Sequence, residues 1–182
     1  CASKILSHYG LLLFRRPLTD AELEDRAGLS RRMAERTNDF YGGMQYALSM
    51  LLQLPDFTFR TEVAIPSADG KSGALDSYSR ATRLSFLMWN TTPDAELLRA
   101  AGSGELNTSA GLAKQVDRLM ASPRLEAGVR AFFADMLCMD TFDTVSKDSL
   151  HYPKSGSAMA SSAREETLRT VIDLALHNNC DI

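Results

Sequence analysis

The most direct candidate for binding chemistry is a pair of arginines, Arg80 and Arg83, three residues apart in "SYSRATRLSFLMW". If this stretch is a helix, both guanidinium groups occupy neighbouring positions and could clamp a carboxylate or a phosphate. An internal ion pair with Asp94 or Glu96 explains the same two arginines at least equally well. The sequence leaves both interpretations open.

Three carboxylates, Asp135, Asp140 and Asp143, surround Cys138. Carboxylate oxygens are the ligands that hard cations such as Ca²⁺ prefer. Their spacing does not match an EF-hand loop, however, and Asp140 and Asp143 can cap backbone amides instead. We therefore predict no metal site and keep Asp140 and Asp143 only as candidates for ligand binding. Cys138 is expected to be a small buried residue.

One of the three histidines is a candidate for function. His151 lies beside Tyr152 in a long polar connection, and loops often carry functional residues. His8 falls on an apolar helical stretch, and His177 falls at the end of another, where the helix dipole explains a basic residue. A structural role is the preferred interpretation for His151 too.

The cysteines predict no cofactor in this chain. Cys1, Cys138 and Cys180 form neither a CxxC nor a CxxCH pattern, which excludes a local zinc knuckle or haem attachment site. Cys1 and Cys180 could form a disulfide if the two ends of the chain meet. The patterns GxSxG, HExxH and GxGxxG and the phosphate-binding P-loop are also absent.

The overall composition is that of a globular protein without a strong excess of positive or negative charge. Hydrophobic residues make up 45% of the 182 residues, and the net charge is −3. No basic excess points to nucleic acid, and no apolar run approaches the roughly 20 residues of a membrane span. Because the chain starts at Cys1 without an initiator methionine, we expect a fragment or a processed product.

The stretch "LLLFRRPLT" predicts a corner between two helices. The first helix should end just before Pro17, because proline cannot donate to a helical ladder. Thr19 and Glu22 then form the T-x-x-E pattern of a capping box, which starts a second helix. A basic grip on an anion is the alternative, but every residue has a structural role in a corner. We accordingly expect Arg15 and Arg16 to tolerate lysine.

Helical periodicity dominates the whole chain, and almost no sheet is expected. The predicted helices lie at about residues 2–14, 20–36, 40–54, 77–89, 94–101, 109–121, 122–137 and 163–177. Expected N-caps include Asp39, Asp76, Thr92, and either Asn107 or Thr108, and Ser162 with Glu165 gives a second capping box.

The predicted fold is therefore an all-α array in two modules. The stretch "PSADGKSG" is typical of an exposed linker. We predict an N-terminal three-helix module at residues 1–64, a linker at 65–75, and a C-terminal module of four to five helices at 76–182.

Two sets of motifs resemble a pair of tandem uncharacterised modules found in large exported planctomycete and myxobacterial proteins. The matches in the first half are Cys1, Ile5, Leu6, "FRRPLT", Glu22, Gly43, Ala47, Leu48 and "PDFTFR". Those in the second half are "LDSY", "RLSFLMW", "PDAELL", "GEL", "QVDRLMASPR", Glu165-Glu166-Thr167 and "NNCDI". The chain departs from the pattern at Asp135 and Met136, where Gln-Trp is usual, and at Leu54, where Ser is usual.

The resemblance implies a setting and not a reaction. Such proteins carry an export signal and c-type cytochrome modules, so an extracytoplasmic location, haem c on another module or partner, and electron transfer are expected. The family pattern continues past Ile182, which implies further domains of the same protein. The resemblance assigns no catalytic residue.

Three functions follow as expectations. The leading one is a helical binding or interaction module of a larger extracytoplasmic, cytochrome-c-linked protein. The second is part of a haem-linked oxidoreductase that acts on an organic or polysaccharide substrate, with polar groups such as Arg80, Arg83, His151 and Asp140 converging in a concave site. The third is an assembly scaffold with a broad exposed apolar patch.

Overall fold

The structure is a computed structural model that describes residues 1–66, 73–145, 147–148, 150–153 and 156–177. Within these residues, helices account for most of the chain, and sheet is confined to one two-stranded ribbon. The predicted all-α fold with negligible sheet is confirmed. No helix in this part of the chain combines the length and apolar character needed to cross a membrane.

Two compact units make up the chain. One comprises Cys1–Ser85 with Thr92–Gln115, and the other comprises Phe86–Thr91 with the chain from Val116 onward.

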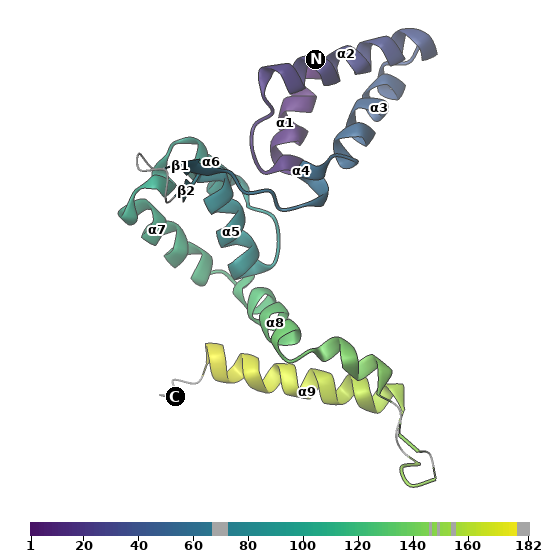
Figure 1. Cartoon of the computed structure of the whole chain (residues 1–182), viewed down its shortest axis with the longest axis vertical. Coiled ribbons are helices and arrows are strands. Elements are labelled where there is room, and N and C mark those ends of the chain that lie inside the picture. The colour runs from purple at the N-terminus through teal and green to yellow at the C-terminus, as the bar shows by residue number, and fades with distance from the viewer. Residues whose placement is uncertain (67–72, 146, 149, 154–155, 178–182) are drawn as a thin grey trace. The chain divides into compact units, whose positions relative to one another are not determined.

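The N-terminal bundle consists of α1 (Ala2–Phe14), α2 (Asp20–Thr37), α3 (Phe40–Leu52) and the short α4 (Pro55–Thr58). The first three helices pack beside one another (Figure 1). Apolar side chains at helical spacing fill the space between them, and the fully buried ones include Leu6, Ala47 and Leu51. Because each buried leucine contributes about 2 kcal/mol, this cluster is the main source of stability for the bundle.

The corner between α1 and α2 forms as the sequence predicts. α1 ends at Phe14, and the next residue, Arg15, caps it with a left-handed φ of 59°, two residues before Pro17. The Thr19 hydroxyl accepts a hydrogen bond from the Glu22 N–H at 3.2 Å, and the Glu22 carboxylate accepts one from the Thr19 N–H at 2.7 Å. Both halves of the capping box are therefore present, and that prediction is confirmed.

The start of α3 is also set locally. The Asp39 carboxylate accepts hydrogen bonds from the N–H groups of Tyr41 at 2.9 Å and Gly42 at 3.0 Å. The next residue, Gly43, faces α2 so closely that a Cβ there would lie 2.8 Å from the backbone nitrogen of Ala34. Only glycine allows this approach of the two helices.

The following segment forms a short ribbon and three α-helices. Its elements are β1 (Ala64–Pro66), β2 (Gly73–Leu75), α5 (Ser77–Trp89), α6 (Ala95–Gly102), the 3₁₀ helix η1 (Glu105–Asn107) and α7 (Ser109–Met120). The two strands run antiparallel with Ile65 opposite Ala74. The predicted linker thus begins and ends in paired strands.

One predicted cap in this segment is wrong. The Asp94 carboxylate accepts a hydrogen bond from the Leu97 N–H at 2.9 Å, so α6 begins at Ala95 and Thr92 is not its cap. A carboxylate is as good a cap as a hydroxyl, and Asp94 is the residue that reaches the first-turn N–H donors. Of the two predicted candidates, Asn107 and Thr108, it is Thr108 that caps α7, accepting from the Gly111 N–H at 3.1 Å.

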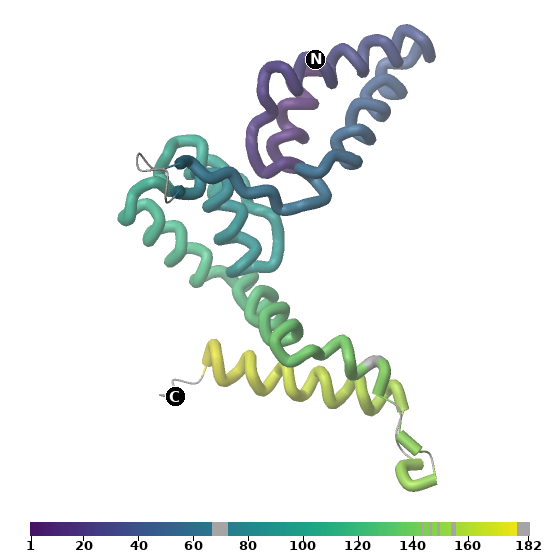
Figure 2. The backbone as a smooth tube through the Cα atoms, viewed as in Figure 1, coloured from purple at the N-terminus to yellow at the C-terminus, as the bar shows by residue number. Residues whose placement is uncertain are grey.

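The C-terminal elements are α8 (Leu125–Met136), the 3₁₀ helix η2 (Met139–Thr144) and α9 (Ser157–Leu176). Figure 2 shows the chain reversing after α8, so that α9 lies beside it. Met139, Leu168 and Ile172 form the buried core between them.

The predicted starts of both helices are wrong. α8 begins at Leu125, because Ser122 and Pro123 form a turn before it. α9 begins at Ser157, which leaves Ser162 inside the helix instead of at a capping box. Alanine favours helix, and Ala160 is buried, so the helix extends upstream of the pattern that resembled a start.

The expectation that Cys138 is buried is also wrong. Its φ of 50° is left-handed, and its side chain is exposed. The turn at Cys138 ends α8 and directs the next residue inward, so Met139, at 2% exposure, takes the buried position.

Candidate ligand-binding site

Arg80 has a structural role. Its Nε donates to the carbonyl of Leu75 at 2.9 Å, and its Nη1 donates to the carbonyl of Leu106 at 2.9 Å. The guanidinium therefore joins the end of β2 to η1 from its place on α5. Two of its five N–H donors are thus used by main-chain carbonyls, which fixes the side chain to the fold.

Arg83 pairs with a carboxylate that the sequence did not indicate. Its Nε and Nη2 donate to the two carboxylate oxygens of Glu62 at 2.9 and 2.6 Å. An ion pair thus forms, as the structural interpretation expected, but with neither Asp94 nor Glu96. Arg80 and Arg83 are separately engaged and do not form a clamp.

The candidates in the long connection do not form a common site among the described residues. His151 Nδ1 lies 2.8 Å from a carboxylate oxygen of Asp148, and both side chains are exposed. Asp140 is 98% exposed and lies 3.9 Å from Arg164. The side chain of Asp143 lies outside the described residues. No group of three potential metal ligands occurs in the described part of the chain.

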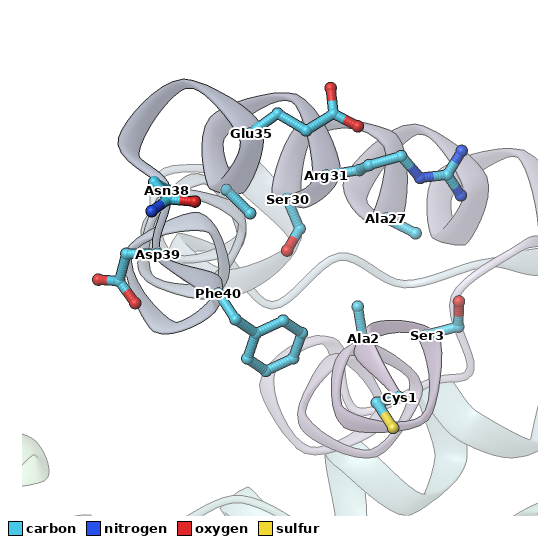
Figure 3. A pocket seen from close by; sticks show the side chains of 11 residues that line it. Cys1, Ala2, Ser3, Ala27, Ser30, Arg31, Glu35, Asn38, Asp39 and Phe40 are labelled. Atoms are coloured by element: carbon cyan, nitrogen blue, oxygen red, sulfur yellow. The ribbon is translucent and has the colours of Figure 1, made fainter.

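The proposed disulfide partners cannot be compared, because Cys180 lies outside the described residues. Cys1 is exposed and lines a cavity of about 540 Å³ between α1 and α2 (Figure 3). Ala2 and Ala27 lie on opposite sides of this cavity, and the Phe40 ring lies at one end. Most of the lining side chains are small, and Arg31 on α2 is the arginine among them.

A groove of about 580 Å³ between α8 and α9 brings together more directed polar groups, and we call it the α8–α9 groove. Its residues come from the end of α5 and from facing sides of the two helices: Asn90, Ala127, Arg130, Ala131, Ala134, Ser161, Arg164, Glu165 and Leu168. The alanines recur at helical spacing on α8 and provide an apolar floor. Two guanidinium groups, a carboxylate, an amide and a hydroxyl surround it.

Glu165 is the electrostatic centre of the groove. Arg130 donates through Nη1 and Nη2 to its two carboxylate oxygens at 2.8 and 3.3 Å. Arg169 Nε donates to one of the same oxygens at 2.7 Å. These two guanidinium groups, Arg130 first, lower the pKa of the Glu165 carboxyl below its ordinary value. The carboxylate therefore stays ionised throughout the physiological range.

The remaining polar groups differ in how they are held. Arg130 also lies 3.7 Å from Glu126, one turn earlier on α8. Asn90 adopts a left-handed φ of 52° just after α5, and its side chain is exposed. Among residues other than glycine, left-handed conformations are uncommon and are enriched for asparagine. The backbone turn at Asn90 therefore sets the position from which its side-chain amide extends.

Sequence reasoning missed this groove. In the sequence, Glu165 indicates a helix start and belongs to a family motif, and no motif distinguishes Arg130 or Arg164. A usable signal was the pattern of Ala127, Ala131 and Ala134 beside Arg130, which places small and basic positions along one side of a helix.

Comparison with known families places the groove within a defined module. Residues 75–182 match the family described as PSD4, protein of unknown function (DUF1592). The chain belongs to the PSD4 family. Residues 1–62 match a second family, PSD5, protein of unknown function (DUF1595). Searches of curated proteins and of solved structures found no match. The α8–α9 groove lies wholly in the PSD4 module, as do Arg80, Arg83 and His151.

Proposed function

We propose that this chain is a helical binding module, with its ligand site in the α8–α9 groove, of a larger extracytoplasmic protein linked to c-type cytochromes. The observation that carries the binding role is the convergence of Arg130, Arg164 and Glu165 with two neutral polar side chains over an apolar floor. Small-molecule sites of about 300–1,000 Å³ typically combine such a floor with a few directed polar groups.

The electrostatics of the groove favour binding over proton transfer. A general acid or base works best when its pKa lies near the operating pH. The two arginines lower the pKa of Glu165 and so move it away from that range. Arginine itself stays protonated. Binding and orientation are therefore the chemistry that these residues supply best.

The extracytoplasmic and cytochrome-linked setting rests on the sequence resemblance. Its test is an absorption spectrum, with metal analysis, of the full-length protein recovered from its native source. A haem band is the expected result. A colourless, metal-free protein contradicts the cytochrome link. The binding role does not depend on this result, because it has a separate test.

The binding role is tested by two-dimensional NMR of the chain, titrated with sugars, sugar acids, amino acids and phosphate esters at millimolar concentration. We expect at least one class to shift the backbone signals of Ala127, Ala131 and Ser161. Ala131→Trp, which fills the floor, should abolish those shifts. Ala158→Trp, at an exposed position of α9, is the matched control and should retain them. A groove that responds to none of the classes contradicts the proposal.

An assembly scaffold is the second candidate, and exposed aromatic side chains on α3 favour it. Phe40, Tyr41 and Tyr46 are 44%, 80% and 52% exposed. Aromatic side chains are enriched in protein interfaces. Sedimentation velocity should then show self-association of the chain that Tyr46→Ser weakens, and a monomer at all concentrations counts against this candidate.

A further inference from the structure

The relation between Glu165 and its two arginines has a consequence for the chemistry of the ligand. Arg130 presents two N–H donors to the two oxygens of one carboxylate, the geometry by which arginine recognises carboxylates in general. The groove therefore already contains one bound carboxylate, which belongs to the protein itself.

Glu165 is also held from its other side. Arg169 lies one turn further along α9 and donates to the Oε1 atom at 2.7 Å. If Arg130 turned to another carboxylate, Glu165 would keep Arg169 as its partner, and no unpaired charge would result. The exchange replaces one ion pair of Arg130 with an equivalent one, so its cost in electrostatic free energy is small.

We propose that the ligand of the α8–α9 groove carries a carboxylate, which binds Arg130 and Arg164 by taking the place of Glu165 on Arg130. This inference rests on the proposed binding function and names the ligand class of that site. Among the described residues, the lining of the groove includes one acidic residue, Glu165, and two arginines, which gives this part of the lining a net positive charge. Outside this lining, Asp140 lies 3.9 Å from Arg164 and Glu126 lies 3.7 Å from Arg130, so a ligand carboxylate would compete with these and the other interactions of the two arginines.

The rest of the groove fits a hydroxylated acid. Asn90 and Ser161 offer an amide and a hydroxyl, both on exposed residues, and the alanine floor accepts the C–H face of a compact organic molecule. A sugar acid combines these features: one carboxylate for the arginines, and hydroxyl groups for the neutral polar side chains.

The test compares D-glucuronate with D-glucose, which differ in the carboxylate alone, by NMR titration of the whole chain. We expect glucuronate to shift the backbone signals of Ala127, Ala131 and Ser161, with at least fivefold weaker binding of glucose. Arg164→Gln should weaken glucuronate binding at least fivefold, and a thermal midpoint measured on the same variant separates loss of binding from loss of the fold. Arg130→Gln should weaken it similarly.

The decisive variant is Glu165→Gln, because it removes the internal competitor for Arg130. We expect glucuronate binding to tighten severalfold. Glu166→Gln is the matched control: it makes the same change of charge one residue away, on an exposed side chain that does not line the groove. It should leave the affinity nearly unchanged.

The possible outcomes separate this inference from the function on which it rests. If glucose binds as well as glucuronate, or if only inorganic phosphate binds, the groove is a ligand site and the carboxylate assignment is wrong. If Glu165→Gln weakens binding while the thermal midpoint is unchanged, the exchange with Glu165 is wrong. If nothing binds the groove, both the inference and the binding function fail.

Discussion

Arg16 and Glu22 form a bidentate ion pair, with both N···O distances at 2.9 Å. Glu22 is at the same time one half of the capping box with Thr19. A second carboxylate, that of Asp56 in α4, lies 2.7 Å from the same guanidinium. The corner between α1 and α2 is therefore joined to α4 by one arginine. The stretch "RRPLT" is a corner, as predicted, but its arginines do more than end a helix.

Replacing Thr19 with alanine should lower the free energy of unfolding by about 0.5–2 kcal/mol, the usual effect of losing an N-cap hydroxyl. The change is measured by urea denaturation. Thr37→Ala is the control, because the Thr37 hydroxyl donates to the carbonyls of Met33 and Asp39 and, among the described residues, caps no N–H group. Equal midpoints for Thr19→Ala and the unaltered chain would show that the capping box does not stabilise the corner.

Replacing Arg16 with lysine should destabilise the bundle by about 1 kcal/mol. An ammonium group cannot reproduce the two parallel bonds to Glu22 together with the bond to Asp56. This reverses the expectation from sequence that lysine is tolerated here. Arg36→Lys, on the exposed side of α2, is the control and should have little effect. An equally small effect at Arg16, measured as the denaturation midpoint, would restore the original expectation.

At Arg15 too we now expect lysine to be poorly tolerated, for a different reason. Arg15 is 5% exposed and donates to the main-chain carbonyls of Leu13, Asp56 and Phe59. A planar guanidinium reaches these three acceptors from one position, which an ammonium cannot do in the same geometry.

The stability of the bundle should depend on pH through Glu22. The hydrogen bond from Arg16, followed by that from the Thr19 backbone, lowers the pKa of Glu22 from 4.5 to about 2. A lowered carboxyl pKa contributes stability that is complete above about 4.5 and is lost as the pH falls towards 2. Glu22→Gln should therefore cost stability at neutral pH, and the difference from the unaltered chain should shrink between these two values. Parallel denaturation curves of the two proteins at neutral and acidic pH test this, and a constant difference would contradict it.

Two glycine-to-alanine changes in neighbouring helices should have opposite effects. Gly43→Ala places a methyl group 2.8 Å from the Ala34 backbone nitrogen, and overpacking of this kind costs about 1–3 kcal/mol. Gly28→Ala meets only the flexible end of Arg32, at 3.3 Å, and should stabilise α2 by about 0.4–1 kcal/mol. Thermal denaturation of both variants checks the pair, and effects of the same sign would rule out close packing as the reason for Gly43.

The features predicted correctly from the sequence are those that depend on neighbouring residues. Thr19, Asp39 and Thr108 are followed within three residues by the N–H groups that they cap. The capping pattern at Ser162 fails because burial of Ala160, which depends on packing against other elements, extends α9 beyond the local start signal.

The candidate site depended on contacts that no local pattern contains. Arg83 finds Glu62 at a separation of 21 residues, and Arg130 finds Glu165 at a separation of 35. Charge and helix position show that these side chains need partners, but only the folded chain shows which. For this reason the sequence identified Arg80 and Arg83 as candidates and missed the α8–α9 groove.

The contacts of Glu62 and Val63 affect how the chain can be divided for expression. The PSD5 match ends at residue 62 and the PSD4 match begins at residue 75. Yet Val63 accepts from the Asp76 N–H at 3.0 Å and donates to the Ser79 hydroxyl at 2.9 Å, while Glu62 holds Arg83. A truncated PSD4 polypeptide that starts at the family boundary would lose all three contacts, which are made by Asp76, Ser79 and Arg83. One that starts a few residues before Glu62 keeps them, so the boundary suited to producing a stable fragment lies upstream of the boundary that family membership defines.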